Sequence, residues 1–269
     1  MHGLGNDFVV VDCFERDIKL NAAQIKMMAD RHFGIGCDQI LLLGPPEHGD
    51  ADVRYRIYNA DGGEVSQCGN GARCIAVYLY NRGLVKKDEV IAETNDGLLK
   101  LYRQKDGQVR VNMGVPQFEP AEIPIQARQR KNKYQLRING KELSFSAVSI
   151  GNPHAVLEVE DVDQAPVETL GPEIQQNDMF PEGVNVGFMQ IIDQQHIRLR
   201  VYERGAGETL ACGSGACAAV VAGYGDKRLA GQVDAGLKGG HLLVSWQGEG
   251  EPVWVIGPAT FVYEGRIRL

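Results

Sequence analysis

Hydrophobic and polar residues alternate in two segments of the chain, 53–58 and 197–202, and both segments contain β-branched residues. This period of two predicts half-buried β-strands. A glycine-rich loop follows each segment, and then come residues 72–80 and 216–224, which are rich in Ala, Val, Leu and Tyr. Each is predicted to form a helix that is apolar all round and therefore buried at the centre of its domain.

These segments belong to an internal repeat. Residues 55–74 (YRIYNADGGEVSQCGNGARC) align without gaps on residues 199–218 (LRVYERGAGETLACGSGACA), at an offset of 144, which is 212 minus 68. Two weaker echoes, 5–8 against 151–154 and 36–40 against 187–191, occur in the same order. A fixed offset of this kind indicates a duplicated structural unit. Eight aligned pairs are identical: Arg56/Arg200, Tyr58/Tyr202, Gly63/Gly207, Glu64/Glu208, Cys68/Cys212, Gly69/Gly213, Gly71/Gly215 and Ala72/Ala216.

The rest of the chain contains short β-rich segments such as 108–112 and 242–246, and one further predicted helix, 22–31, with Asn21 as its N-cap. We therefore expect an α+β protein of two pseudo-symmetric domains, each a mostly antiparallel β-sheet or barrel wrapped around a central helix. The first domain is expected to cover residues 1–113 and the second 114–257. The C-terminal segment 258–269 is expected to return to the first domain, with a last strand at 265–269.

Composition narrows the class of partner. The chain has 269 residues, of which 43% are hydrophobic and 23% charged, as in ordinary globular proteins. Its formal net charge is -7 and no block of Lys and Arg occurs, so nucleic acid is not an expected partner. The sequence shows no signal peptide and no run of about 20 apolar residues, so we expect a cytoplasmic protein without a membrane partner. The expected partner is a small molecule.

Six cysteines occur, and in a reducing cytoplasm they are expected to be free thiols. Two of them, Cys68 and Cys212, hold the same position in the repeat, each directly before a predicted helix, in the sequences CGNG and CGSG. The unpaired N–H groups and partial positive charge of a helix N-terminus stabilise a thiolate. Such positions lower a cysteine pKa from about 8.5 to roughly 3.5–7.5. The remaining cysteines, in apolar surroundings, are expected to be structural: Cys13, Cys37, Cys74 and Cys217.

Two thiols on equivalent loops of two domains suit the inversion of a carbon stereocentre. One group removes a proton from one face of the carbon, the carbon becomes planar, and the other group returns a proton to the opposite face. A thiolate and a thiol perform these steps when their pKa values lie near the operating pH. The two helix N-termini would bind a carboxylate and stabilise the charge that develops on it. The pattern predicts an epimerase or racemase that needs no cofactor.

The same cysteines and glycines could in principle form three other kinds of site: a metal site, a disulfide and a nucleotide site. The spacings Cys68/Cys74 and Cys212/Cys217 are neither CxxC nor a helical i, i+4 pair, so no metal site is expected. A disulfide between Cys68 and Cys212 would inactivate the site. Residues 213–218 fit the loose dinucleotide pattern G-x-G-x-x-A, but no apolar central strand precedes them. A nucleotide-binding oxidoreductase would use this pattern, and it is the alternative from another functional class.

Longer motifs carry a family resemblance. The segments 1–8 (MHGLGNDF), 59–62 (NADG), 64–73 (EVSQCGNGAR), 151–154 (GNPH), 203–209 (ERGAGET) and 212–215 (CGSG) are similar to those of diaminopimelate epimerases. The resemblance runs along the whole chain to the ending GRIRL at 265–269. It implies interconversion of LL- and meso-2,6-diaminopimelate, in the route to lysine and peptidoglycan, by a cytoplasmic homodimer without cofactor or metal.

The resemblance also implies roles for individual residues. Cys212 would take the proton from the LL substrate and Cys68 would donate one on the opposite face. His154 and Glu203 match positions thought to tune the pKa of the cysteines. A zwitterionic substrate needs an Arg, an acidic group and amides. The residues implied to bind substrate are Asn6, Gln39, Asn59, Gly69, Asn70, Asn152, Asn185, Glu203, Arg204, Gly213 and Ser214.

Two further functions remain open. A proline or hydroxyproline racemase of the same fold is the nearest alternative, although such enzymes usually carry His where this chain has Asn70. A non-catalytic binder of diamino acids would keep the Asn and Arg residues but would not need two thiols. Lys238 stands where a Pro is common in the family.

Overall fold

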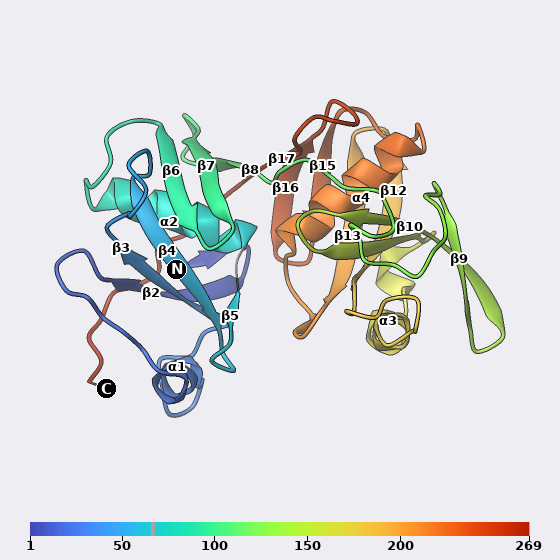
Figure 1. Ribbon diagram of the computed structural model, residues 1–269. Helices are drawn as coiled ribbons and strands as arrows, with labels where there is room; N and C mark the ends of the chain where they lie inside the picture. Colours follow the sequence, from blue (N-terminus) through green and yellow to red (C-terminus); the bar gives the residue numbers. More distant parts are fainter. Residues whose placement is uncertain (66–67, 269) are drawn as a thin grey trace. The chain divides into compact units, whose positions relative to one another are not determined.

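The computed structural model describes residues 1–65 and 68–268, and the chain divides into two compact units (Figure 1). Unit 1 comprises Met1–Asn112 and Gly257–Leu269, and unit 2 comprises Met113–Ile256. Both units combine strands with few helices, so the predicted α+β class is confirmed. No helix within the described ranges is long and apolar enough to span a membrane.

Unit 1 is built mainly of antiparallel strand pairs, with parallel pairs β2–β3 and β4–β6. Its long helix α2 contacts β1, β2, β7 and β8 and buries most of its side chains. The elements of this unit are β1 (His2–Gly3), β2 (Asn6–Asp12), α1 (Ala22–Ala29), β3 (Gln39–Gly44), β4 (Val53–Asn59), β5 (Glu64–Val65), α2 (Gly69–Asn81), β6 (Glu89–Thr94), β7 (Gly97–Arg103) and β8 (Val109–Asn112).

Unit 2 has the same design with longer strands. Its parallel pairs are β11–β12 and β13–β15, and helix α4 contacts β10, β11, β12, β13, β15 and β16. The elements are β9 (Tyr134–Ile138), β10 (Lys141–Ser149), β11 (Pro153–Glu158), η1 (Val162–Gln164), α3 (Val167–Gln175), β12 (Asn185–Asp193), β13 (His196–Glu203), β14 (Gly207–Glu208), α4 (Gly213–Gly225), β15 (Gln232–Leu237), β16 (Gly240–Ser245) and β17 (Trp254–Gly257).

The two predicted central helices are present, and each extends beyond its predicted range to include the glycine-rich loop. Residues 215–223 of α4 are all buried, because strands surround the helix. Gly223 is required there, since a Cβ atom would lie 2.4 Å from Leu229 Cδ1. Helix α2 departs from the prediction of an apolar surface all round, because Arg73 is 0% exposed inside it.

The repeat is visible in the strand register. Tyr58 pairs with Glu64 in unit 1, and Tyr202 pairs with Glu208 in unit 2, so the offset of 144 positions (202 minus 58) holds across both pairs. Each glutamate also accepts two hydrogen bonds from an arginine on the neighbouring strand, Arg56 at 2.8 and 2.8 Å and Arg200 at 2.7 and 2.9 Å. The identical Arg and Glu residues of the repeat are therefore ion pairs that fix the strand before each loop.

Helix α1 confirms the Asn21 cap but ends at Ala29, two residues before the predicted end. Asn21 and Gln24 form a capping box at the start. At the end, Asp30 takes an extended conformation, and its carboxylate accepts hydrogen bonds from the backbone N–H groups of His32 and Phe33. This local alternative to the helical pattern ends the helix.

The predicted last strand is wrong for the described residues 265–268, which are exposed and pair with no strand. The C-terminal segment does return to unit 1, but earlier: Thr260 bridges His2, and Pro258 O accepts a hydrogen bond from Arg73 Nε at 3.1 Å. Residue 269 lies outside the described part. Helix α3 was not predicted, because Pro172 inside it and a Pro166 cap without a side-chain hydrogen bond mask its signal.

Candidate active site

Cys68 is the N-cap of α2, with φ -150° and ψ 107°, and its Sγ accepts a hydrogen bond from the backbone N–H of Gly71 at 3.4 Å. The helix begins here because the chain leaves the extended conformation at Cys68 and enters a glycine-containing first turn. Gly71 also lets α2 pack closely, since a Cβ atom there would lie 3.3 Å from Leu41 Cδ2. The half-buried thiol thus lies at the positive end of a helix, as predicted.

The Asn6 amide lies beside this sulfur and is itself held by the Asn70 amide. Asn6 Oδ1 lies 3.9 Å from Cys68 Sγ and accepts a hydrogen bond from Asn70 Nδ2 at 3.1 Å. A second amide pair lies at the start of β3 and the end of β4, where Gln39 Nε2 donates to Asn59 Oδ1 at 2.8 Å. We call the group Cys68, Asn6 and Asn70 half-site 1.

Cys212 is the N-cap of α4 and repeats this geometry in unit 2. Its Sγ accepts from the Gly215 N–H at 3.4 Å and lies 3.6 Å from Ser214 Oγ. The thiol donates to Glu203 Oε2 at 3.0 Å, and Thr209 Oγ1 donates to the other carboxylate oxygen. We call the group Cys212, Glu203, Ser214, Asn152 and His154 half-site 2.

The pKa of Cys212 shifts in the direction opposite to that expected from a helix N-terminus. The helix N-terminus was expected to lower the cysteine pKa, but burial, followed by the charge and hydrogen bond of Glu203, raises the pKa of Cys212 well above its ordinary value. Cys212 is only 4% exposed, so the thiolate loses most of its solvation. Its hydrogen bonds with Ser214 and Gly215 act in the opposite direction and are weaker. In this structure the group is a thiol whose proton points at a carboxylate.

His154 is the neutral imidazole of half-site 2. Burial, followed by the charge of Arg204, lowers its pKa to about 3. Its Nε2 lies 2.9 Å from Asn152 Oδ1, and Asn152 Nδ2 donates to Ser214 Oγ at 3.4 Å. Because the Asn152 oxygen must accept, we assign the Nε2-protonated tautomer to His154. His154 therefore reaches Cys212 through Asn152 and Ser214.

Asn185 holds the backbone of unit 2 in place. The residue is 3% exposed; its Nδ2 donates to Pro153 O at 3.0 Å and its Oδ1 accepts from the backbone N–H of Arg204 at 2.9 Å. The guanidinium of Arg204 donates to Glu182 O at 2.9 Å. Asn185 thus fixes the chain where β13 ends and Arg204 begins the next turn.

The residues named from the sequence divide between the two half-sites and their immediate surroundings. In unit 1 they are Asn6, Gln39, Asn59, Cys68, Gly69 and Asn70, and in unit 2 they are Asn152, His154, Asn185, Glu203, Arg204, Cys212, Gly213 and Ser214. Sequence reasoning missed three contacting residues, Asp38, Arg73 and Thr209. A charged residue inside an otherwise apolar helix was an available signal for Arg73.

The other cysteines lack this setting. Burial raises the pKa of Cys37 to about 11 and that of Cys74 to about 12, and it also raises the pKa of Cys13. Cys74 and Cys217 are 0% exposed within α2 and α4, as predicted. Among residues 1–65 and 68–268, no group of three or more His, Cys, Asp or Glu side chains is placed to hold a metal ion.

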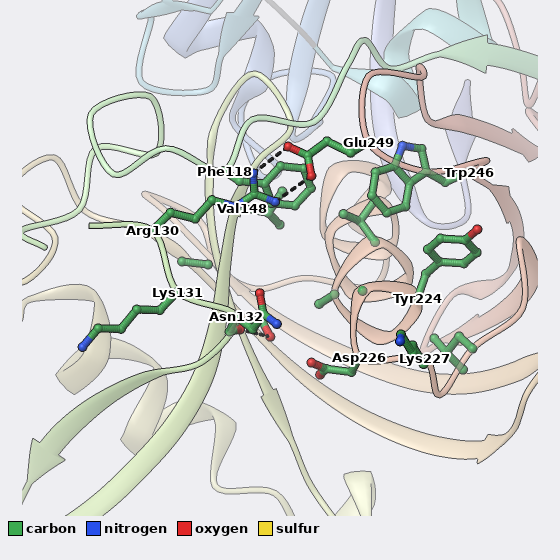
Figure 2. Close-up of a pocket in the computed structure, with 16 residues that line it drawn as sticks. Phe118, Arg130, Lys131, Asn132, Val148, Tyr224, Asp226, Lys227, Trp246 and Glu249 are labelled. Atoms are coloured by element: carbon green, nitrogen blue, oxygen red, sulfur yellow. Dashed lines mark hydrogen bonds and ion pairs between the residues drawn. The ribbon is translucent and has the colours of Figure 1, made fainter. Parts of the chain in front are cut away.

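A hollow of about 620 Å³ lies in unit 2, at the opposite end of α4 from Cys212 (Figure 2). A helix of 13 residues is about 20 Å long. Three aromatic rings line one side of the hollow: the ring centroid of Trp246 lies 6.0 Å from that of Phe118 and 5.3 Å from that of Tyr224. An ion pair between Arg130 and Glu249 lies beside these rings, with the Arg130 guanidinium carbon 4.6 Å from the Phe118 ring centroid (Figure 2). The hollow is separate from half-site 2.

Comparison with known proteins places the chain in a family. The family model described as diaminopimelate epimerase matches residues 1–119 and 146–262. Proteins named diaminopimelate epimerase from Nitrosospira multiformis and Ectopseudomonas mendocina are 54% and 51% identical over 269 residues, which is 100% of this chain and 97% and 98% of theirs. A solved structure of a probable proline racemase from Agrobacterium radiobacter has the same fold, with a TM-score of 0.73 and 18% identity, over 100% of this chain and 91% of that one. The chain belongs to the diaminopimelate epimerase family.

Proposed function

We propose that this protein interconverts LL- and meso-2,6-diaminopimelate without a cofactor, with Cys68 and Cys212 as the two acid/base groups, in the formation of lysine and peptidoglycan precursors. The observation that carries the proposal is the duplicated thiol: each sulfur caps a helix at the same position of the repeat, and each accepts the N–H of the third helical residue at 3.4 Å. Membership of the family supports the choice of substrate.

The proton balance requires one thiolate and one thiol at the start of each turnover. For the LL substrate, Cys212 must first lose its own proton, and the Glu203 carboxylate at 3.0 Å is within reach to accept it. The thiolate then removes the Cα proton, and Cys68 delivers a proton to the opposite face of the planar carbon. Cys212 ends as a thiol and Cys68 as a thiolate. Before another LL turnover, Glu203 releases the proton it accepted and Cys68 takes up a proton. The reverse reaction from the meso isomer uses Cys68 as the base and Cys212 as the acid.

Substrate recognition is assigned to the groups around the two sulfurs. The backbone N–H groups at 69–70 and 213–214, at the ends of two helices, suit the α-carboxylate and the charge that develops on it. Arg204 suits the distal carboxylate. Amide side chains would fix the orientation of the substrate: Asn6, Gln39, Asn59, Asn70, Asn152 and Asn185.

We further propose a cytoplasmic homodimer. The C-terminal segment of unit 1 exposes Phe261, Val262 and Tyr263 by 40%, 56% and 62%, which is apolar surface that a second copy would cover. A reducing compartment would keep both thiols from oxidation. Light scattering of the reduced protein is expected to give twice the mass of the chain, and a monomer at micromolar concentration would contradict the dimer.

The decisive experiment follows the α-proton. The reduced protein is incubated with LL-diaminopimelate in D₂O, and NMR is expected to show deuterium at the α-carbon together with the meso isomer. The Cys68→Ala and Cys212→Ala variants are expected to lose epimerisation, whereas Cys13→Ala, outside both half-sites, is the matched control and keeps it. Absence of exchange in the wild type, or undiminished turnover in the double Cys→Ala variant, contradicts the proposal.

The nearest competing function is racemisation of proline or hydroxyproline, which the fold shared with a probable proline racemase favours. The same D₂O incubation with L-proline separates the two. We expect no α-proton exchange with proline and rapid exchange with LL-diaminopimelate. The opposite pattern would assign the protein to the racemase reaction.

A further inference from the structure

We propose that Arg73 and Asp38 are positioning residues that lock the side-chain amides of Asn70 and Asn6, and so determine which Asn6 atom faces Cys68. The catalytic consequence rests on the proposed function, whereas the locking itself concerns unit 1 alone. Arg73 does not follow from the duplication, because the equivalent position of the repeat is Cys217 in α4.

Four side chains form a continuous series of hydrogen bonds, which we call the amide chain. Arg73 Nη2 donates to Asn70 Oδ1 at 2.7 Å, Asn70 Nδ2 donates to Asn6 Oδ1 at 3.1 Å, and Asn6 Nδ2 donates to Asp38 Oδ2 at 3.0 Å. A guanidinium can only donate and an ionised carboxylate can only accept. The direction of the amide chain is therefore fixed at both ends, and with it the orientation of both amide groups.

Both ends of the amide chain are anchored. Arg73 is 0% exposed and also donates to Gly69 O at 3.3 Å and to Pro258 O at 3.1 Å. A buried guanidinium held in this way cannot turn away without leaving its charge unpaired in the core.

At the other end, Asp38 Oδ1 accepts from Arg31 Nη2 at 2.8 Å, and Asp38 Oδ2 accepts from the backbone N–H of Asp7 at 3.0 Å. The parallel pairing of β2 with β3 holds Asp7 and Asp38 at matching places, just before Phe8 and Gln39. The carboxylate is therefore fixed in position before it meets Asn6.

The amide chain determines which atom of the Asn6 side chain lies beside the Cys68 sulfur. Because the Asn6 nitrogen is committed to Asp38, the Asn6 oxygen is the atom that lies 3.9 Å from Cys68 Sγ. An acceptor oxygen beside a sulfur stabilises the S–H form, whereas an amide N–H₂ group would stabilise the thiolate. The amide chain thus holds an acceptor against Cys68, as Glu203 does against Cys212 in unit 2.

Half-site 2 also holds oxygen atoms beside its cysteine, but with different residues. Asn152 and Ser214 occupy the places of Asn6 and Asn70, but the orientation of Asn152 is set by the neutral imidazole of His154, at 2.9 Å. Ser214 then lies against Cys212 at 3.6 Å. Ionic residues at both ends are therefore a feature of half-site 1, and they account for an arginine inside the predicted apolar helix.

The test is the Asp38→Asn variant in the full chain, with Asp12→Asn as the matched control and Asp38→Glu as the conservative variant. Asparagine at 38 can donate or accept, so the Asn6 nitrogen loses its fixed acceptor and Asn6 is held in its orientation by Asn70 alone. Iodoacetamide is the probe, and mass spectrometry of the Cys68 peptide gives the alkylation rate as a function of pH. Asp38→Asn is expected to raise the Cys68 alkylation rate at pH 7 by roughly 3- to 10-fold. Asp38→Glu and Asp12→Asn are expected to stay near the wild type.

Alkylation needs no substrate, so this result stands even if the protein does not act on diaminopimelate. If it does, kcat is expected to fall more in Asp38→Asn than KM rises, and the acidic limb of the pH profile is expected to move. A folded Asp38→Asn protein with the wild-type alkylation profile would overturn the proposal. If Asp38→Asn does not fold, Gly3→Ala tests the other end of the amide chain, because its Cβ would lie 3.0 Å from Arg73 Nη2, and an unchanged alkylation profile would again overturn it.

Discussion

A side chain at Gly215 would crowd the first turn of α4. A Cβ atom there would lie 2.9 Å from Val201 Cγ2 and 3.2 Å from Cys212 Sγ, both shorter than ordinary contacts. Val201 is 2% exposed on β13 and cannot move away, so the strain of Gly215→Ala is expected to displace the Cys212 thiol. Gly71 is the same position of the repeat, but there the nearest atoms are the side-chain ends of Leu41 and Phe8, at 3.3 and 3.4 Å.

The expected magnitudes follow from these contacts. Overpacking costs about 1–3 kcal/mol, and replacing glycine by alanine within a helix returns about 1 kcal/mol, so Gly215→Ala should lose roughly 0–2 kcal/mol of unfolding free energy. Displacement of a reacting group by a fraction of an ångström should lower kcat by about 10- to 100-fold. Gly71→Ala is expected to lose less than Gly215→Ala in both measurements.

Urea denaturation and the D₂O exchange assay measure these two quantities. The control is Gly225→Ala at the far end of α4, where a Cβ atom meets nothing within 4 Å. This variant should keep its kcat and gain up to about 1 kcal/mol of stability. If Gly215→Ala and Gly225→Ala have the same kcat, the argument that the Gly215 contact positions Cys212 is refuted.

Three further outcomes are expected. Glu203→Gln removes a carboxylate that raises the pKa of Cys212, so alkylation of Cys212 by iodoacetamide at pH 7 should become faster, and a slower rate would contradict this assignment. His154 has a pKa of about 3 in the folded protein and 6.5 when exposed. Between pH 6.5 and pH 3 the unfolded state therefore binds more protons than the folded state. The free energy of unfolding should fall as the pH is lowered through this range, by up to about 5 kcal/mol. His154→Phe should flatten that slope in urea denaturation at several pH values, and an unchanged slope would disprove the buried neutral imidazole. Arg200→Gln breaks an ion pair whose carboxylate is 7% exposed, and the free energy of unfolding should fall by about 3 kcal/mol. Arg56→Gln breaks the more exposed equivalent pair in unit 1, and the free energy of unfolding should fall by less than about 1 kcal/mol. Equal losses would mean that burial does not distinguish the two pairs.

Much of the fold was predictable because its signals are local. The alternation at 53–58 and 197–202 corresponds to β4 and β13, and the Asn21 cap begins α1. Helix α3 escaped prediction because Pro172 contradicts the local signal and only packing keeps the helix. The ends of elements also shifted where a side chain competes with the helical pattern, as Asp30 does after α1.

Residues of the candidate site were also predictable where their signal is local and not where it depends on packing. The glycine-rich loops and the repeat identified Cys68 and Cys212, since a helix start has a recognisable sequence. The supporting residues Asp38, Arg73 and Thr209 were not identified, because they reach the half-sites through strand pairing or from inside a helix. Proximity of this kind depends on register and packing, which the spacing along the chain does not record.

By itself the sequence determined the duplication, the two capped helices, the equivalent thiols and the family to which the chain belongs. Only the tertiary structure decided the charge states. A helix N-terminus taken alone favours a thiolate, yet Cys212 is held as a thiol because burial removes its solvation and Glu203 places a negative charge 3.0 Å away. His154 is neutral for the same reason of burial. Desolvation and charge–charge energies depend on which groups share a low-dielectric space, and that sharing arises only when distant parts of the chain have packed together.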